Sequence, residues 1–196
     1  MDWTPYYNKE YFALELPEKF NDKLENLPSG IKTLTIGRSI YSLLGNFAVF
    51  NQPINKDDLP NSLTYIHFGY SFNQPIDGLP VNLLTLYFGN KFNQPIEGLP
   101  VNLRTLYFGD DFNQPIDGLP ANLVTLYFGD NFNQPIDGLP NSIIELTLGY
   151  YFNKPANNLP FGLKRLFMRG VGRVEPKIPF GCTLTKYPDC KLRFEC

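Results

Sequence analysis

Apolar side chains recur at a fixed interval of twenty residues over the middle of this chain. Each copy of the pattern opens with a phenylalanine, continues through prolines, and ends in a short run of alternating apolar and polar residues. A constant period of about 20 to 50 residues is typical of solenoid proteins. The pattern therefore predicts one domain with seven tandem repeats over residues 20–170. The repeats open at Phe20, Phe50, Phe72, Phe92, Phe112, Phe132 and Phe152.

One repeat is expected to contain a single short strand. Residues 83–88 follow the spacing Leu-x-x-Leu-x-Phe, which is the strand spacing of leucine-rich repeats. Because side chains alternate across a strand, Leu86 and Phe88 are expected to face inward, and Thr85 and Tyr87 outward. Stacked repeats then form one parallel sheet. The inward residues expected in this turn of the solenoid, which continues into the next repeat, are Leu83, Leu86, Phe88, Phe92, Ile96 and Leu99.

The sequence pattern predicts turns and extended chain between the strands. A glycine column precedes Leu-Pro and is expected to have positive φ, since glycine tolerates left-handed conformations. A second glycine column ends each strand, and paired prolines exclude helices between the strands. The prediction is a right-handed β-solenoid with one parallel sheet and a turn-rich convex side. The first column contains Gly78, Gly98, Gly118 and Gly138, with Asn26 and Asn158 in the outer repeats; the second contains Gly37, Gly69, Gly89, Gly109, Gly129 and Gly149.

Three sequence motifs recur in the repeats: Phe-Asn-Gln-Pro, Leu-Pro and Leu-x-x-Leu-x-Phe-Gly. Together they resemble the FNIP repeat, a divergent leucine-rich repeat of amoebae and of large DNA viruses of protists. The resemblance covers about residues 20–170. Four repeats have 20 residues where the family's usual unit is two residues longer. The asparagine of the general leucine-rich pattern is also displaced by two positions. We expect the displaced column, from Asn73 to Asn153, to bond backbone groups between coils.

Both ends of the chain depart from the repeat. Residues 1–19 are expected to form a short helical cap over the open end of the core, which solenoids need for solubility. Residues 171–196 are expected to form a C-terminal cap. In this cap the sequence Ile178–Gly181 is similar to Leu159–Gly162, and we expect it to start a degenerate coil. The helical interpretation of the N-terminal cap rests on Thr4 and Pro5 as a helix start, with Tyr7, Tyr11 and Leu14 at helical spacing.

All three cysteines, Cys182, Cys190 and Cys196, lie in the C-terminal cap. An odd number of cysteines without an N-terminal signal peptide favours free, reduced thiols. Their spacing is not that of a zinc site, and no histidine is near them in sequence. We therefore expect no metal and no disulfide here.

The first repeat carries an apolar ten-residue insertion at residues 40–49. Two interpretations stay open for it. The insertion folds back over the first coil, or it forms an exposed apolar docking patch.

Charge is segregated along the chain, although the formal net charge is only −2. Residues 72–160 carry three basic and eight acidic residues, a net of −5, whereas residues 161–196 carry eight basic and three acidic residues, a net of +5. The favoured interpretation of this segregation is a solvated surface. The functional alternative is a partner of complementary charge, because segregated charge steers encounter. The basic end is small and most aromatic residues of the strands lie on the acidic part, so nucleic acid is not an expected partner.

The outer face of the strands presents two columns of side chains. Tyrosine provides contact area at little entropic cost, so its recurrence fits an interface. Tyr and Thr also stabilise sheets through cross-strand pairs, and both roles stay open. The columns read Thr35, His67, Tyr87, Tyr107, Tyr127, Thr147, Phe167 and Thr33, Tyr65, Thr85, Thr105, Thr125, Glu145, Arg165. The residues predicted to bind a partner are Tyr65, His67, Tyr87, Tyr107, Tyr127, Glu145, Arg165 and Phe167.

Catalysis has little support in the sequence. His67 is the only histidine and falls in the tyrosine column, and there is no phosphate-binding glycine loop or recognisable acid–base pair. We expect no enzymatic activity, no cofactor and no metal. The absence of an apolar run near 18 residues and of a signal sequence predicts a soluble, unsecreted protein that does not bind membranes. We also expect a monomer. Its expected location is the cytoplasm, that of the host cell if the protein is viral.

The favoured function is a non-catalytic repeat scaffold for protein–protein interaction through the strand face. The partner's identity is not encoded in any motif. One alternative is binding of a glycan or another repeating ligand on the Tyr/Thr ladder. Another is ice binding by a regular threonine array, although only Thr85, Thr105 and Thr125 line up in succession.

Overall fold

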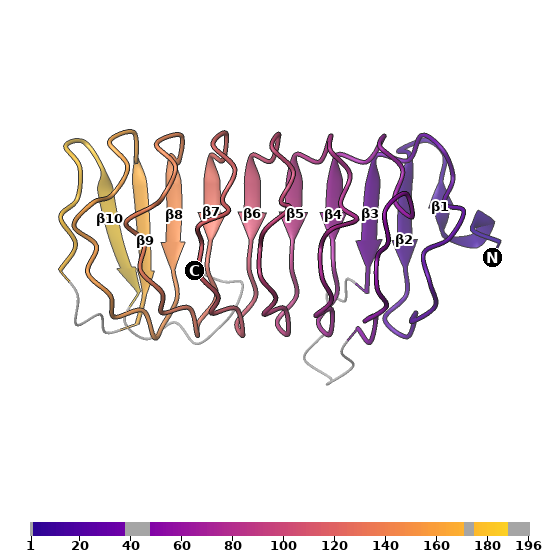
Figure 1. Cartoon of the computed structure of the whole chain (residues 1–196), viewed down its shortest axis with the longest axis horizontal. Coiled ribbons are helices and arrows are strands. Elements are labelled where there is room, and N and C mark those ends of the chain that lie inside the picture. Colours follow the sequence, from indigo (N-terminus) through magenta and orange to yellow (C-terminus); the bar gives the residue numbers. More distant parts are fainter. Residues whose placement is uncertain (1, 38–47, 171–174, 188–196) are drawn as a thin grey trace.

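The computed structural model describes residues 2–37, 48–170 and 175–187. Within these ranges ten strands lie side by side in sequence order and form one sheet (Figure 1). Among them, β1 is antiparallel to β2, and β2 to β10 are parallel. The strands are β1 (Tyr7–Asn8), β2 (Ala13–Leu16), β3 (Thr33–Ile36), β4 (Tyr65–His67), β5 (Thr85–Tyr87), β6 (Thr105–Tyr107), β7 (Thr125–Tyr127), β8 (Glu145–Leu148), β9 (Arg165–Arg169) and β10 (Thr183–Tyr187).

Each of the seven repeats contributes one strand, from β3 to β9. The register follows the repeat, so that Leu86 of β5 pairs with Leu106 of β6, which pairs with Leu126 of β7. The segments between these strands are turns and extended chain over residues 48–164. The predicted β-solenoid with one parallel sheet and a turn-rich convex side is confirmed.

The core is a stack of apolar side chains that runs the length of the array. The six residues predicted to face inward in one coil, which runs from Leu83 of the third repeat to Leu99 of the fourth, are all buried, with at most 7% of their surface exposed. Two phenylalanine columns lie against each other in this core. The ring centroids of Phe88 and Phe92 are 3.7 Å apart within one coil, and those of Phe92 and Phe112 are 6.1 Å apart between coils. Large buried aromatic rings therefore join each coil to the next.

The asparagine column bonds between coils, as predicted. The backbone N–H of Asn113 donates to Oδ1 of Asn93 at 2.9 Å, and Nε2 of Gln114 donates to the same oxygen at 3.1 Å. The backbone bond recurs at 2.9 Å along the whole array. Each asparagine therefore satisfies a loop donor of the following coil. The acceptors are Asn21, Asn51, Asn73, Asn93, Asn113 and Asn133.

The prediction of positive φ for the whole first glycine column is wrong. Gly98 has φ 94° and Asn26 has φ 56°, but four other positions are not left-handed. At Gly78 a Cβ would lie 2.5 Å from the carbonyl oxygen of Asn55 in the preceding coil. Glycine is needed there because two backbones approach closely and not because of its φ. The positions without left-handed φ are Gly78, Gly118, Gly138 and Asn158.

The second glycine column marks the closest approach between coils. A Cβ placed on Gly109 would overlap the carbonyl oxygen of Gly89, and the same overlap recurs one and two coils further on. None of these glycines from Gly69 to Gly149 has left-handed φ. From β4 to β8 the array therefore uses glycine after each strand, so that neighbouring backbones can meet.

The predicted helical N-terminal cap is wrong beyond its first turn. Only Thr4–Tyr6 is helical, as the 3-10 helix η1, and residues 7–16 form the hairpin of β1 and β2. Trp3, not Thr4, is the N-cap residue. Leu14 and Leu16 are buried because they alternate across β2, a period of two that the helical spacing obscured.

The structure describes parts of the C-terminal cap and of the 40–49 insertion. The Ile178–Gly181 motif precedes β10, which pairs with β9 and extends the sheet. Cys182 is a free thiol, whereas Cys190 and Cys196 lie outside the described residues. Of the 40–49 insertion, only its last two residues are described; Ala48 is buried and Val49 is 44% exposed.

Candidate interaction face

The outward residues of β4 to β9 form the two predicted columns. Tyr107 pairs with Tyr87 on one side and Tyr127 on the other. One predicted member of the columns behaves differently: Thr35 of β3, in the first repeat, is buried at 5% exposure. We call the remaining outward surface the strand face. The predicted binding residues on it are Tyr65, His67, Tyr87, Tyr107, Tyr127, Glu145, Arg165 and Phe167.

The tyrosines of the strand face are stacked on one another. The ring centroids of Tyr87 and Tyr107 are 4.4 Å apart with planes 15° apart, and those of Tyr107 and Tyr127 are 5.3 Å apart with planes 20° apart. Both faces of the Tyr107 ring are therefore covered by neighbouring rings. Such stacking is worth about 0.5–1.5 kcal/mol per pair beyond the burial of area.

The stack ends toward the N-terminus at β4. Tyr65 and His67 lie against Tyr87 with centroid distances of 5.6 and 5.7 Å, at tilted angles. His67 is therefore a member of the aromatic ladder. The sequence interpretation of this histidine as a ladder residue agrees with its position.

Burial changes the acidity of the inner tyrosines. Partial burial raises the pKa of Tyr107 above its ordinary value, and the nearby Tyr87 and Glu145 add to the shift. Burial also raises the pKa of Tyr127, against a smaller opposing effect of Arg169. Both phenols are consequently neutral at physiological pH, where each hydroxyl donates and accepts hydrogen bonds.

Arg169 closes the tyrosine stack on the C-terminal side. Its Nη1 donates to the hydroxyl of Tyr127 at 2.6 Å and lies 3.2 Å from Oδ1 of Asp130. The side chain is only 9% exposed, and it reaches across β8, where the small Thr147 occupies the tyrosine column. A guanidinium so buried needs a charged partner, which Asp130 provides.

Sequence reasoning did not place Arg169 or Asp130 at the face. The contact joins residues 42 positions apart, so no local spacing indicates it. One signal was present in the sequence, because Arg169 stands in a column that is otherwise glycine.

Polar groups follow the strand ends on the same side as Asp130. Nδ2 of Asn90 donates to Oδ2 of Asp110 at 2.6 Å, and Lys91 forms an ion pair with Asp111 at 2.8 Å. The lysine Nζ also lies 5.8 Å from the ring centroid of Tyr70. These contacts link successive coils along an edge with acidic side chains.

The second column ends in an ion pair. Arg165 of β9 donates through Nε to Oε1 of Glu145 in β8. The hydrogen bond from Arg165 is the largest cause that lowers the pKa of Glu145 below its usual value. Next to this pair, Phe167 stacks on Tyr187 of β10 with centroids 6.4 Å apart.

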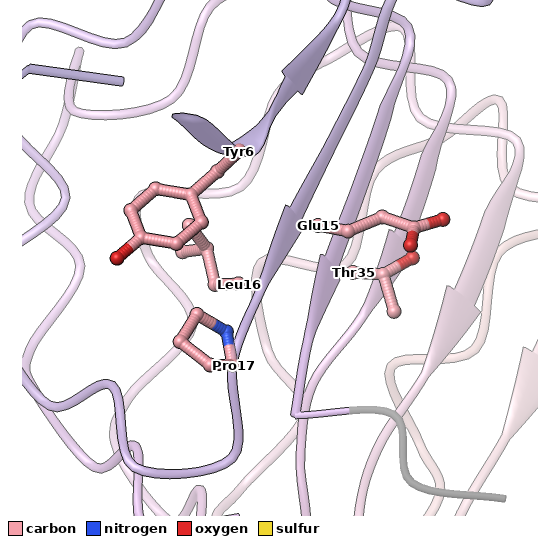
Figure 2. Close-up of a pocket in the computed structure, with 5 residues that line it drawn as sticks. All are labelled: Tyr6, Glu15, Leu16, Pro17 and Thr35. Atoms are coloured by element: carbon pink, nitrogen blue, oxygen red, sulfur yellow. The ribbon is translucent and has the colours of Figure 1, made fainter. Parts of the chain in front are cut away.

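An open pocket of about 250 Å³ lies at the N-terminal end of the sheet. Figure 2 shows Glu15 and Thr35 projecting to the same side from the neighbouring strands β2 and β3. Tyr6, Leu16 and Pro17 complete the lining. The Glu15 carboxylate and the Thr35 hydroxyl place hydrogen-bonding groups at this pocket.

In the described part of the chain, no group of three or more His, Cys, Asp and Glu side chains has the geometry of a metal site. In those same ranges, no helix is long and apolar enough to cross a membrane.

Comparisons with known proteins identify the repeats. The family model of the FNIP repeat matches residues 50–91, 92–131 and 132–169. A comparison with curated proteins finds no match. The chain is similar to CroV588 of a giant virus, whose crystal structure is described as a novel circular LRR protein structure, with a TM-score of 0.77 and 39% identity over 89% of this chain. It spans 26% of that protein's length. The chain belongs to the FNIP-repeat family of leucine-rich-repeat-like solenoids.

Proposed function

We propose that this protein is a non-catalytic scaffold that binds a protein partner through the strand face. The observation that carries the proposal is the tyrosine stack, which holds three large amphipathic side chains in fixed positions on a rigid sheet. Preorganised side chains lose little entropy on binding, and tyrosine is enriched among the residues that dominate interface energies. Membership of a repeat family adds support, because such proteins generally act as binding surfaces.

The ring geometry favours a protein over a glycan. Sugars bind aromatic residues by stacking on a ring face, but both faces of Tyr107 are covered by Tyr87 and Tyr127. What the stack offers to a ligand is ring edges and hydroxyl groups. Edges and hydroxyls suit the backbone amides and mixed side chains of a protein surface.

The net charge around the strand face indicates the sign of the charge expected on the partner. The span 72–160, which carries β5 to β8, has a net charge of −5. Acidic side chains at an interface steer a basic partner and accelerate its association at low ionic strength.

The proposal is tested by affinity purification with the wild-type chain and with a Tyr107→Ser variant, alongside a glycan array. A protein that is retained by the wild type and lost by the variant supports the proposal. Retention of the same proteins by both baits contradicts it. Binding confined to the array, and abolished by Tyr107→Ser, supports the glycan alternative.

A further inference from the structure

The pocket at the N-terminal end of the sheet contains a buried hydroxyl group. Thr35 of β3 lines this pocket and is only 5% exposed. Within residues 2–37, 48–170 and 175–187, its hydroxyl forms no hydrogen bond. Burial of a polar group is unfavourable unless the group is hydrogen-bonded. Thr35 therefore offers a hydrogen-bonding position to a group that enters the pocket.

Glu15 adds a negative charge to the same pocket. It lies beside Thr35 on the neighbouring strand β2, and both side chains project to the same side (Figure 2). Glu15 is exposed, and in the described part of the chain its carboxylate has no ion pair and no hydrogen bond. An ionised carboxylate only accepts hydrogen bonds, and a hydroxyl accepts as well as donates. The two groups together favour a ligand that carries a positive charge and N–H donors.

The other walls of the pocket suit an apolar stem. They are formed by Tyr6, Leu16 and Pro17. Pockets that bind drug-sized ligands hold about 300–1,000 Å³. With about 250 Å³, this pocket fits a single long side chain better than a cofactor. Lysine and arginine combine an apolar stem with a cationic head, and an aromatic ring such as that of Tyr6 attracts a cation.

The pocket continues the aromatic column of the strand face. Thr35 pairs with His67 of β4, whose ring centroid lies 5.7 Å from that of Tyr87. Tyr107 is three strands away from Thr35, which corresponds to about 14 Å at a strand spacing of about 4.8 Å. A protein that lies on the strand face and contacts Tyr107 can therefore place one side chain in the pocket.

The pocket also breaks the periodicity of the strand face. From β5 to β7, successive coils present the same threonine and tyrosine, so a partner displaced by one coil meets nearly the same side chains. In the column that contains Tyr107, Glu15 is the one carboxylate among strands β2 to β10. A charged contact at one end of a periodic surface favours a single register.

We propose that this pocket binds a basic side chain of the strand-face partner and thereby fixes the partner's position along the array. The inference rests on the proposed function and gives the partner a chemical feature. The ammonium or guanidinium group donates to the Glu15 carboxylate and to the Thr35 hydroxyl. Its stem packs against Tyr6, Leu16 and Pro17.

A first experiment tests the pocket without a partner. The intact chain is titrated with n-butylammonium chloride at constant ionic strength, and backbone amide signals are followed by NMR. We expect saturable shifts at Leu16 and Thr35, and at least fivefold weaker binding of the neutral n-butanol. Glu15→Gln should weaken the cation at least fivefold, and Thr35→Val at least threefold. A parallel titration with n-butylguanidinium shows whether the site prefers the head group of lysine or of arginine.

The matched control is Glu10→Gln. It removes the same charge in the turn that joins β1 to β2, outside the lining of the pocket, and should leave the Kd within twofold. Equal binding of the ammonium and the alcohol would overturn the inference, and so would equal effects of Glu15→Gln and Glu10→Gln.

A second experiment uses the partner retained in the affinity purification. Glu15→Gln should weaken its Kd at least fivefold, whereas Glu10→Gln should stay within twofold. A photo-crosslinker in the partner should label one coil of the wild-type chain and several neighbouring coils of Glu15→Gln. An unchanged Kd or an unchanged labelling pattern in Glu15→Gln would overturn the role in fixing position. Failure of the proposed function is seen separately, as retention of the same proteins by Tyr107→Ser, and leaves the NMR result unaffected.

Discussion

Alanine at Gly109 should destabilise the array, whereas alanine at Gly138 should not. The two substitutions add the same methyl group to different glycine columns. At Gly109 the new Cβ would overlap the carbonyl oxygen of Gly89, so the coils must separate or the backbone must shift. At Gly138 no atom lies within 4 Å of the added Cβ, and its φ is not left-handed.

The structure sets the expected magnitudes. Inserting a methyl group into a tightly packed site costs about 1–3 kcal/mol. At Gly138, alanine restricts the unfolded chain without strain and should stabilise by about 0.4–1 kcal/mol. Gly98 gives a third case, because its φ of 94° carries strain of about 1–2 kcal/mol for a residue with a Cβ, although its nearest contact is 3.8 Å away. The gap between Gly109 and Gly138 should therefore be about 1.4–4 kcal/mol.

Urea unfolding followed by circular dichroism measures this gap. With a denaturant slope near 2 kcal/mol/M, a difference of about 1.4–4 kcal/mol separates the two midpoints by about 0.7–2 M. Unchanged slopes would indicate that all variants unfold from the same native state. Equal midpoints for Gly109→Ala and Gly138→Ala would refute the claim that glycine permits close contact between coils.

Three further predictions concern polar contacts. Asn113→Ala removes the acceptor for the Asn133 N–H and should lower the free energy of unfolding by about 1 kcal/mol, measured in urea. Arg169→Met strands a partly buried carboxylate and should cost about 1–3 kcal/mol in the same assay; no change would mean that the ion pair contributes nothing. Because the pKa of Glu145 is lowered in the folded state, its contribution is present above its usual value of 4.5 and is lost as pH falls below it. Arg165→Gln should therefore lower the melting temperature at pH 7 but not at pH 2, and equal losses would contradict the pairing.

Much of the fold was predictable because its physics repeats with the sequence. Inward residues such as Leu86 and Phe92 follow from strand alternation and a fixed period, and both are fully buried. The asparagine column was predictable for the same reason. A polar residue kept at one position in every coil has a partner one coil away, as Asn93 and Asn113 do.

The errors came from places where one residue type satisfies two physical demands. Glycine fits both a left-handed turn and a close backbone contact, so its presence at Gly78 could not distinguish them. At the N-terminus, Tyr7 and Leu14 are seven residues apart, a spacing that fits a helix. They instead pair across the β1–β2 hairpin.

The columns of the strand face were predictable, but the contacts between them were not. Alternation placed Tyr87 and Tyr107 outward, and the register aligned them. Ring stacking depends on side-chain torsions that a sequence pattern does not specify. The contact of Arg169 with Tyr127 joins strands that are two coils apart, so no spacing in the sequence indicates it.

The affinity of the purified partner for Tyr107→Ser tests the central claim most directly. The matched control is Tyr151→Ser, which makes the same change at a tyrosine that is 60% exposed and outside the strands. The proposed interface predicts a loss of about 2 kcal/mol or more for Tyr107→Ser, or about thirtyfold in Kd, with an unchanged circular dichroism spectrum. The control should stay within twofold. A Kd for Tyr107→Ser within twofold of the wild type, together with loss of binding when residues 40–49 are replaced, would contradict the account and assign docking to the insertion.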